Sequence, residues 1–118
     1  MQERRLDDLL VRITGHTRPN ACVLALLGSA GAWNLAAQEQ AFHDAGATGR
    51  PLVVDLSGLD FGDEVFLGLL LHAHSSPRGL VLISPATGSF ARRLHRTGVE
   101  ELFNTQKTLP LALAQLPG

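Results

Sequence analysis

The chain has 118 residues, of which 45% are hydrophobic and 18% are charged, and its formal net charge is -1. These values are typical of one folded domain and exclude a disordered chain of low hydrophobicity and high charge. A nearly neutral chain in which both signs of charge are interspersed has no broad attraction for a polyanion, so nucleic acid is not an expected partner.

The distribution of apolar residues argues against membrane-spanning and secretory segments. No run approaches the roughly 18 apolar residues that a spanning helix needs. The N-terminal MQERRLDDLL has charges where a signal peptide has its apolar centre. The single cysteine, Cys22, lies within the apolar run ACVLALL and is expected to be a small core residue. We therefore expect a cytoplasmic protein with no direct membrane insertion.

The first predicted elements are two strands and a helix. Residues 9–15 and 21–28 are apolar runs joined by the turn-rich HTRPN, which predicts a hairpin. For residues 1–8 we predict no element and allow a flexible N-terminus. Residues 32–46 are rich in helix formers and end on a glycine, so they predict a helix. Its side chains at three- and four-residue spacing are Trp33, Ala36, Ala37, Gln40 and Ala41.

Strands and helices alternate in the rest of the chain. Residues 51–57 and 79–84 predict buried strands. Asp63 is placed to cap a helix whose apolar side is Phe66, Leu67, Leu70, Leu71 and His74.

Two further helices are predicted after the last of these strands. Residues 85–98 predict a helix with Phe90 and Leu94 on its buried side, ending at Gly98. Residues 109–116 predict a short closing helix with a proline in its first turn. Because parallel strands need a helical crossover, the order predicts an α/β fold. We expect one domain over residues 1–118, with a mixed sheet of four to five strands and helices mainly on one face.

Two sequence blocks resemble a known family. They are VVDLSGLDFGD at residues 53–63 and RTGVEELF at residues 96–103. Together with the order of elements from about residue 10 onward, they make the chain similar to the STAS domain, the fold of bacterial anti-sigma factor antagonists. The resemblance implies a small non-enzymatic binding module that docks on a protein kinase which doubles as an anti-sigma factor.

In that family, the aspartate that opens the second helix is followed by two hydroxyl residues and a glycine, and phosphorylation of the second hydroxyl switches docking off. The first turn of a helix suits a phosphate because it presents unpaired amides and the positive end of the helix dipole. Here Asp63 matches the aspartate, but Glu64 and Val65 replace the hydroxyl pair and Phe66 replaces the glycine. Val65 cannot be phosphorylated. The acids of a second family signature, a Gly-Glu-Leu-Asp-like turn, are also missing, because residues 28–31 read Gly-Ser-Ala-Gly.

Two interpretations are open for each of the most informative replacements. Glu64 either mimics part of a phosphate or is an ordinary acidic residue in a first turn. Phe66 is either an exposed apolar anchor or a core residue. Other hydroxyls could take over as phosphate acceptors, although turn and cap roles are commoner for them. They are Ser57, Ser75, Ser76, Thr87 and Ser89.

The remaining polar residues give weaker signals. The five histidines show no spacing of metal ligands, because His72 and His74 are two apart on a helix and face different directions. The others are His16, His43 and His95. No metal, cofactor or catalytic residue is predicted, since no nucleophile or phosphate-binding motif is present. Four arginines could form a basic patch, although a solvated helix face is favoured: Arg78, Arg92, Arg93 and Arg96.

The sequence therefore supports a regulatory binding module that docks on an anti-sigma or kinase-like protein without phosphorylation at position 65. The alternative is a STAS accessory subunit of an ABC-type membrane transport complex, which would bind a transporter ATPase. The docking face is expected to combine residues 28–33, 63–67 and 84–90. The residues expected to contact the partner are Ser29, Trp33, Asp63, Glu64, Val65, Phe66, Leu67 and Thr87.

Overall fold

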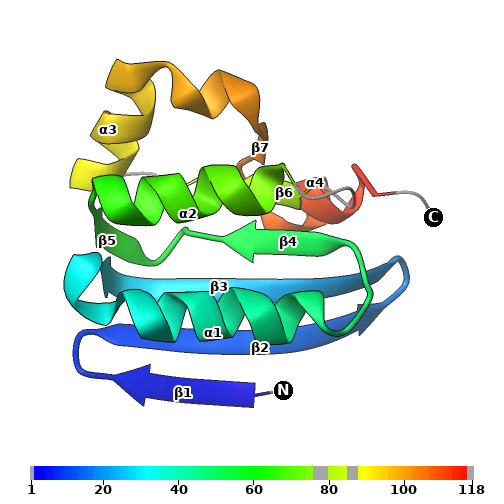
Figure 1. Cartoon of the computed structure of the whole chain (residues 1–118). Coiled ribbons are helices and arrows are strands. Elements are labelled where there is room, and N and C mark those ends of the chain that lie inside the picture. The colour runs from blue at the N-terminus through cyan, green and yellow to red at the C-terminus, as the bar shows by residue number, and fades with distance from the viewer. Residues whose placement is uncertain (1, 76–79, 85–87, 117–118) are drawn as a thin grey trace.

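The computed structural model describes residues 2–75, 80–84 and 88–116 (Figure 1). The strands are β1 (Gln2–Leu6), β2 (Leu9–Thr17), β3 (Asn20–Ala30), β4 (Leu52–Asp55), β5 (Leu59–Gly62), β6 (Leu80–Ile83) and β7 (Asn104–Gln106). The helices are α1 (Leu35–Gly46), α2 (Glu64–His74), α3 (Ser89–Thr97) and α4 (Leu109–Leu113), with 3-10 turns η1 (Ala32–Asn34) and η2 (Val99–Leu102). None of the helices in these ranges has the length and apolar character needed to cross a membrane.

The strands of the described ranges form one mixed sheet in the order β1-β2-β3-β4-β6-β7. The neighbours β1, β2 and β3 are antiparallel, whereas β4, β6 and β7 continue the sheet in parallel with β3. Strand β5 follows β4 and pairs with the far end of β3, after a register shift between Gly28 and Ser29. The carboxyl ends of β3, β5 and β6 consequently lie at one end of the sheet, which is where α/β folds commonly bind other molecules.

The predicted α/β class is confirmed, but the sheet is larger than expected. The N-terminal segment is not a loose terminus: β1 pairs with β2 along its whole length, from Gln2 opposite Ile13 to Leu6 opposite Leu9. The sheet has seven strands within the described residues rather than four to five. The sequence patterns do not predict the short strands β5 (LDFG) and β7 (NTQ), because neither contains a continuous apolar run.

Two apolar clusters lie on opposite faces of the sheet, since successive strand residues point to opposite sides. Val54 packs in the larger cluster beneath α1, α2 and α3, whereas its neighbour Val53 packs in the smaller cluster beneath α4. Three of the four helices thus cover one face, as predicted.

Capping residues set the start of α2, the end of α3 and the start of α4. The side chain of Asp63 caps α2 by accepting a hydrogen bond from the backbone N–H of Phe66 at 3.0 Å, as predicted. Gly98 ends α3 in the left-handed region at φ 70°. The described part of the third helix begins at Ser89, and residues 85–87 lie outside the described ranges. Helix α4 is shorter than predicted and is capped by Thr108.

The first helix differs from its prediction in the face that it buries. A 3-10 turn precedes it, so α1 itself starts only at Leu35. Its buried residues are Gln38, Ala41 and Ala45, whereas Trp33, Ala36 and Gln40 are exposed. The buried row is Asn34, Gln38, Ala41 and Ala45, so it lies about one residue further along the chain than the predicted row and shares only Ala41 with it.

Candidate functional site

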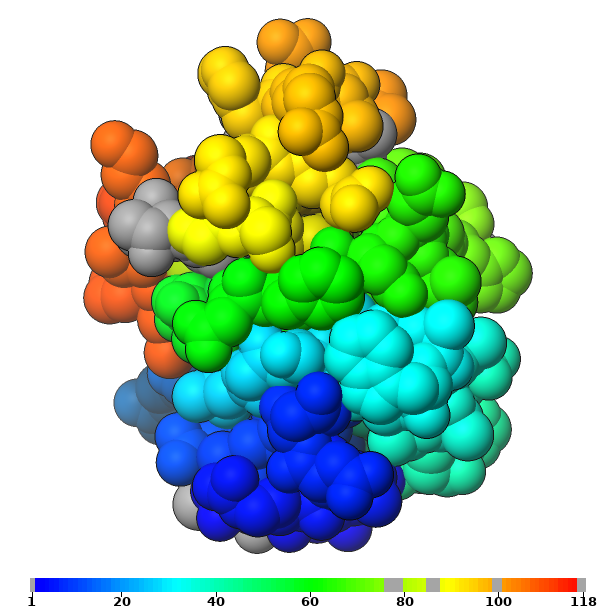
Figure 2. Space-filling view, turned by 90° about the vertical axis from the view of Figure 1, so that its left-hand side faces the viewer, coloured from blue at the N-terminus to red at the C-terminus, as the bar shows by residue number. Residues whose placement is uncertain are grey.

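The first two predicted docking segments meet at the end of the sheet where β3 and β5 finish. Figure 2 views this end, and it shows the β1–β2 turn in blue, residues around η1 in cyan, the start of α2 in green and the start of α3 in yellow, one above the other. We call the part formed by residues 6–8, 29–33 and 63–65 the Trp33 surface. Thr87, from the third predicted segment, lies outside the described residues.

Asp63 joins two of the three segments of this surface, residues 29–33 and 63–65, through one carboxylate. Oδ1 accepts the α2 capping bond, and Oδ2 accepts a hydrogen bond from the backbone N–H of Ala32 at 2.8 Å. The backbone N–H of Asp63 also donates to the carbonyl oxygen of Ala30 at 3.2 Å. The turn after β3 and the first turn of α2 are therefore held in one arrangement.

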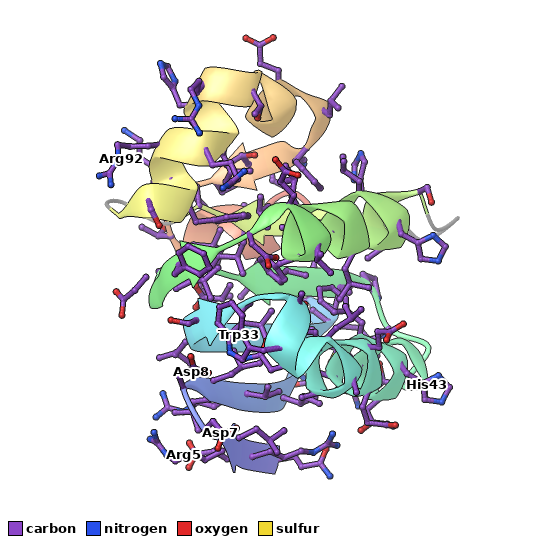
Figure 3. The ribbon with its side chains drawn as sticks, turned by 60° about the vertical axis from the view of Figure 1, so that its left-hand side comes forward. Arg5, Asp7, Asp8, Trp33, His43 and Arg92 are labelled. Atoms are coloured by element: carbon purple, nitrogen blue, oxygen red, sulfur yellow. The ribbon has the colours of Figure 1, made fainter. Side chains whose placement is uncertain are left out.

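Trp33 lies at the centre of this surface with 57% of its area exposed. Its ring stacks on Phe61 with centroids 5.8 Å apart and an interplanar angle of 25°. The indole Nε1 donates a hydrogen bond to Asp8 Oδ1 at 3.2 Å, and both residues are labelled in Figure 3. A Cβ atom at Gly31 would lie 2.1 Å from the indole ring, so only glycine lets the ring lie this close to the turn. Trp33 is thus exposed but held in place.

A buried amide network supports the backbone under Trp33. Asn34 accepts hydrogen bonds at Oδ1 from the Gly31 N–H at 2.9 Å and from Gln38 Nε2 at 2.6 Å. Its Nδ2 donates to the Ser29 carbonyl oxygen at 3.0 Å and to Asp8 Oδ1 at 3.3 Å. Asn34 and Gln38 are 8% and 0% exposed. Such linked bonds make a turn rigid.

The four residues at the start of α2 divide between surface and core. Glu64 has a side chain that is 88% exposed, 3.7 Å from an Arg93 nitrogen, and Val65 is 39% exposed. Phe66 is fully buried against Phe90, with ring centroids 5.3 Å apart, and Leu67 is 9% exposed. The interpretation of Phe66 as an exposed anchor is wrong, because its ring turns inward, and Leu67 does not belong to the exposed surface either.

The alternative phosphate acceptors that the structure describes all have a hydrogen-bond partner within the chain. The Ser57 hydroxyl donates to Asp55 Oδ1 at 2.7 Å, and the Ser75 hydroxyl donates to the His72 carbonyl oxygen at 2.6 Å. The Ser89 hydroxyl lies 3.4 Å from the Asp60 carbonyl oxygen. The bonds of Ser57 and Ser75 are turn and cap roles, whereas the contact of Ser89 joins α3 to β5. Ser76 lies outside the described residues, as does Arg78. Of the arginines in the predicted basic patch, Arg92 and Arg96 are exposed on α3.

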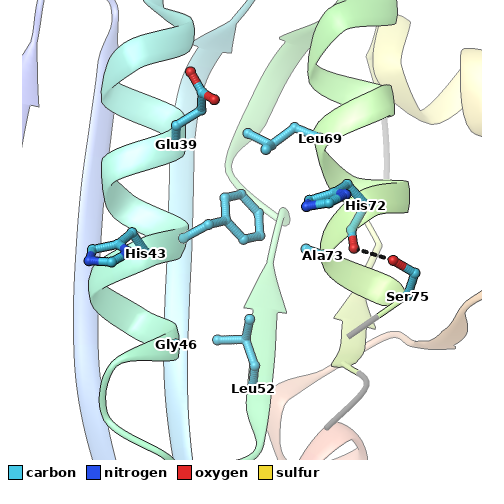
Figure 4. A pocket seen from close by; sticks show the side chains of 9 residues that line it. Glu39, His43, Gly46, Leu52, Leu69, His72, Ala73 and Ser75 are labelled. Atoms are coloured by element: carbon cyan, nitrogen blue, oxygen red, sulfur yellow. Dashed lines mark hydrogen bonds between the residues drawn. The ribbon is translucent and has the colours of Figure 1, made fainter. Parts of the chain in front are cut away.

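A groove of about 450 Å³ lies between the second halves of α1 and α2, away from the Trp33 surface (Figure 4). Its floor is apolar, and Glu39, His43 and His72 stand at its sides. His74 is half-buried and packs on Phe103 with centroids 4.8 Å apart. Within the described ranges, no three histidine, cysteine or acidic side chains are grouped to hold a metal ion.

Two groups with shifted pKa values also lie away from the Trp33 surface. Burial raises the pKa of the Cys22 thiol, which is 1% exposed. The hydrogen bond from Arg4 lowers the pKa of Asp44 and ties β1 to α1. The first shift agrees with the expectation of a small core cysteine, and neither suggests catalysis.

Sequence reasoning missed Asp8 and Phe61, which position Trp33. The signal for Asp8 is the pair of aspartates between Leu6 and Leu9, since such residues favour tight turns between strands. Asp7 occupies the turn with φ 50°, a region that aspartate tolerates better than most residues. Phe61 gives no comparable signal, because its strand is too short for a pattern.

Comparisons with known proteins agree with this architecture. Residues 13–109 match the family model described as "Mlab, STAS domain". The crystal structure of an anti-sigma factor antagonist from Mycobacterium paratuberculosis is similar, with a TM-score of 0.75 and 28% sequence identity over 92% of this chain and 93% of that chain. No curated protein matches the sequence significantly. Since the family model covers most of the sequence, the chain belongs to the STAS domain family.

Proposed function

We propose that the chain is a non-enzymatic regulatory module that binds a partner protein through the Trp33 surface. The observation that carries the proposal is the 57% exposed indole of Trp33, which Phe61 and Asp8 hold in a fixed position. Large exposed aromatic side chains on a rigid support are typical centres of protein interfaces. An aromatic ring that served only the fold would be expected to lie inside.

The proposed partner is an anti-sigma or kinase-like protein, and docking does not require phosphorylation at position 65. The similar antagonist structure supports the class of partner. Val65 supports docking without phosphorylation. Its exposed aliphatic side chain has no hydroxyl and lies where the resemblance implies a phosphate acceptor. A partner would meet an apolar side chain there.

Capture of the partner from native cells tests this function. We expect the tagged chain to retain a kinase-like anti-sigma protein and Trp33→Ala to lose it. The matched control is Leu111→Ala, which removes another exposed apolar side chain, 49% exposed on α4. Capture of a transporter ATPase without a kinase-like protein would replace the proposed partner with the transport alternative. Equal capture by Trp33→Ala would exclude the Trp33 surface as the docking site.

A separate experiment tests the loss of the switch. Val65→Ser restores a hydroxyl at an exposed position and leaves Phe66, a core residue, in place. Incubation of this variant with the captured kinase and ATP should add phosphate at position 65, detected by mass spectrometry, whereas the unaltered chain should gain none there. Absence of phosphate from Val65→Ser would show that the docking geometry differs from that of phosphorylated family members.

A further inference from the structure

We infer that the Trp33 surface binds a basic, arginine-containing segment of its partner, and that the β1–β2 turn supplies the negative charge that attracts this segment. The inference rests on the proposed function and adds the chemistry of the partner. It depends on how apolar and charged side chains are distributed over the described residues.

Exposed apolar side chains are concentrated on this surface. The five large apolar side chains that are exposed within the described ranges are Leu6, Trp33, Val65, Leu102 and Leu111. The first three, at 44%, 57% and 39% exposure, belong to the Trp33 surface. Single exposed apolar residues are normal, but several on one surface mark a binding site.

The charged side chains around Trp33 are mainly acidic. Asp7, Asp8, Asp63 and Glu64 all belong to the surface, and Figure 3 shows Asp7 and Asp8 beside the β1–β2 turn below Trp33. The hydrogen bonds described above to Asp8 and Asp63 come from neutral N–H groups, which leave their negative charges in place. The nearest positive charges lie outside the surface: Arg5 precedes the turn, Arg93 lies near Glu64, and Arg92 lies in the first turn of α3.

The Trp33 surface therefore carries four carboxylates and no lysine or arginine, although the total charge of the chain is only -1. The negative potential is local to the surface rather than a property of the whole molecule. An acidic or phosphorylated segment would be repelled from it, whereas a basic segment would be attracted.

Arginine fits this surface better than lysine does. A guanidinium group can pair with a carboxylate through two hydrogen bonds and can also lie against an aromatic ring. Asp8 places a carboxylate within hydrogen-bond distance of the indole edge, 3.2 Å from Nε1. One arginine could therefore contact both the exposed indole and the acids of the turn.

Intrinsic fluorescence reports directly on this site, because Trp33 is the only tryptophan and the chain has no tyrosine. The probe is a short oligo-arginine peptide, compared with oligo-citrulline and oligo-glutamate peptides of equal length. We expect a saturable change in Trp33 emission with oligo-arginine alone, weaker at physiological than at low salt. A lack of saturable change with oligo-arginine would overturn the inference.

Paired variants separate the acidic turn from general charge. Asp7→Asn with Asp8→Asn removes two charges, keeps a residue that tolerates positive φ at position 7, and keeps an oxygen acceptor for Trp33 and Asn34. The control, Glu39→Gln with Glu101→Gln, removes two exposed charges elsewhere. We expect the turn variant to bind about tenfold more weakly at low salt, as the loss of two exposed ion pairs implies, and the control to bind normally. Equal weakening in both pairs would overturn the inference.

The two proposals can fail separately. Capture of a kinase-like partner that depends on Trp33 but not on Asp7 and Asp8, without oligo-arginine binding, would refute the basic segment and leave the proposed function intact. Oligo-arginine binding that depends on the turn, without any captured regulatory partner, would support the chemistry of the site and refute the proposed function.

Discussion

Phe66 and Val65 are neighbours with opposite roles. Phe66 fills the space between the start of α2 and α3, where it meets Phe90. Gly62 completes this contact, since a Cβ atom there would lie 2.4 Å from the Phe90 ring. The ring that replaces a glycine in the resemblance is therefore part of the core, and only Glu64 and Val65 alter the exposed chemistry of the helix start.

Truncation of these neighbours should affect stability very differently. Phe66→Ala leaves a cavity in a fully buried site and should lower the free energy of unfolding by about 3–5 kcal/mol. Val65→Ala removes a partly exposed side chain and should change it by about 0.5 kcal/mol or less. Urea unfolding at neutral pH measures both values. Similar losses would contradict the inward orientation of Phe66.

Substitution of Asp63 tests the carboxylate that joins the turn after β3 to the start of α2. Asp63→Ala removes both the α2 cap and the bond to Ala32, and should lower the free energy of unfolding by about 1–2 kcal/mol. Asp63→Asn keeps an oxygen acceptor and should lose less. Urea unfolding gives the stability, and Trp33 emission should shift in the alanine variant. An unchanged emission spectrum in Asp63→Ala would show that other contacts alone position the turn.

At the scale of elements, β1 is the least expected part of the sheet. It contributes Leu6 and the Asp7–Asp8 turn to the Trp33 surface, and it is tied to α1 by the ion pair between Arg4 and Asp44. An edge strand held on one side only depends on such contacts. This ion pair therefore helps to hold β1, and with it the β1–β2 turn of the Trp33 surface, on the rest of the sheet.

The ion pair should add stability at neutral pH and lose it in acid. The hydrogen bond from Arg4 is the main cause of the lowered pKa of Asp44. A carboxyl whose pKa is lower in the folded state stabilises the fold above its unfolded pKa, about 3.9, and this contribution disappears as the pH falls through the folded value. Asp44→Asn should thus be less stable than the unaltered chain at pH 7 and equally stable in strong acid. Urea unfolding across this range measures the difference, and a constant difference would contradict the pairing.

Sequence patterns predicted the elements that have long apolar runs, and the ends set by capping residues. Strands β2, β3, β4 and β6 and helix α2 were found in this way, as was the cap at Asp63. Strand β1 was missed because its sequence, QERRL, is mostly charged and exposed and has no apolar pattern. Strands β5 and β7 were missed because they are short and pair with strands far away in the sequence. Two of the three predicted docking segments, residues 28–33 and 63–67, lie together as expected, and their role in binding stays a proposal. The direction of Phe66 was not predicted, because its partner Phe90 comes from another helix.

At the scale of the whole molecule, β3 lies between the two apolar clusters. Cys22 faces the larger cluster and Val23 faces the smaller one. The same strand pairs with β2, β4 and β5, and it ends at the Trp33 surface. We expect β3 to become accessible to solvent only when most of the domain unfolds.

Cys22 provides a measurement of that opening. Its thiol is buried, its pKa is raised mainly by burial, and it is the only cysteine. A thiol reagent should modify the folded chain very slowly, because the reactive thiolate is both scarce and shielded. Modification should become fast in denaturant and faster in Phe66→Ala than in Val65→Ala. Rapid modification of the folded chain would show that β3 opens locally.

The double use of the Asp63 carboxylate bears on how related sequences should be compared. An acid at this place has a structural value of its own, since it fixes both the helix start and the adjoining turn. Selection for a foldable chain would preserve it whether or not a hydroxyl follows. In a survey of related sequences, an aspartate here would therefore not separate modules that can be switched from modules that cannot, and the residue two places later would.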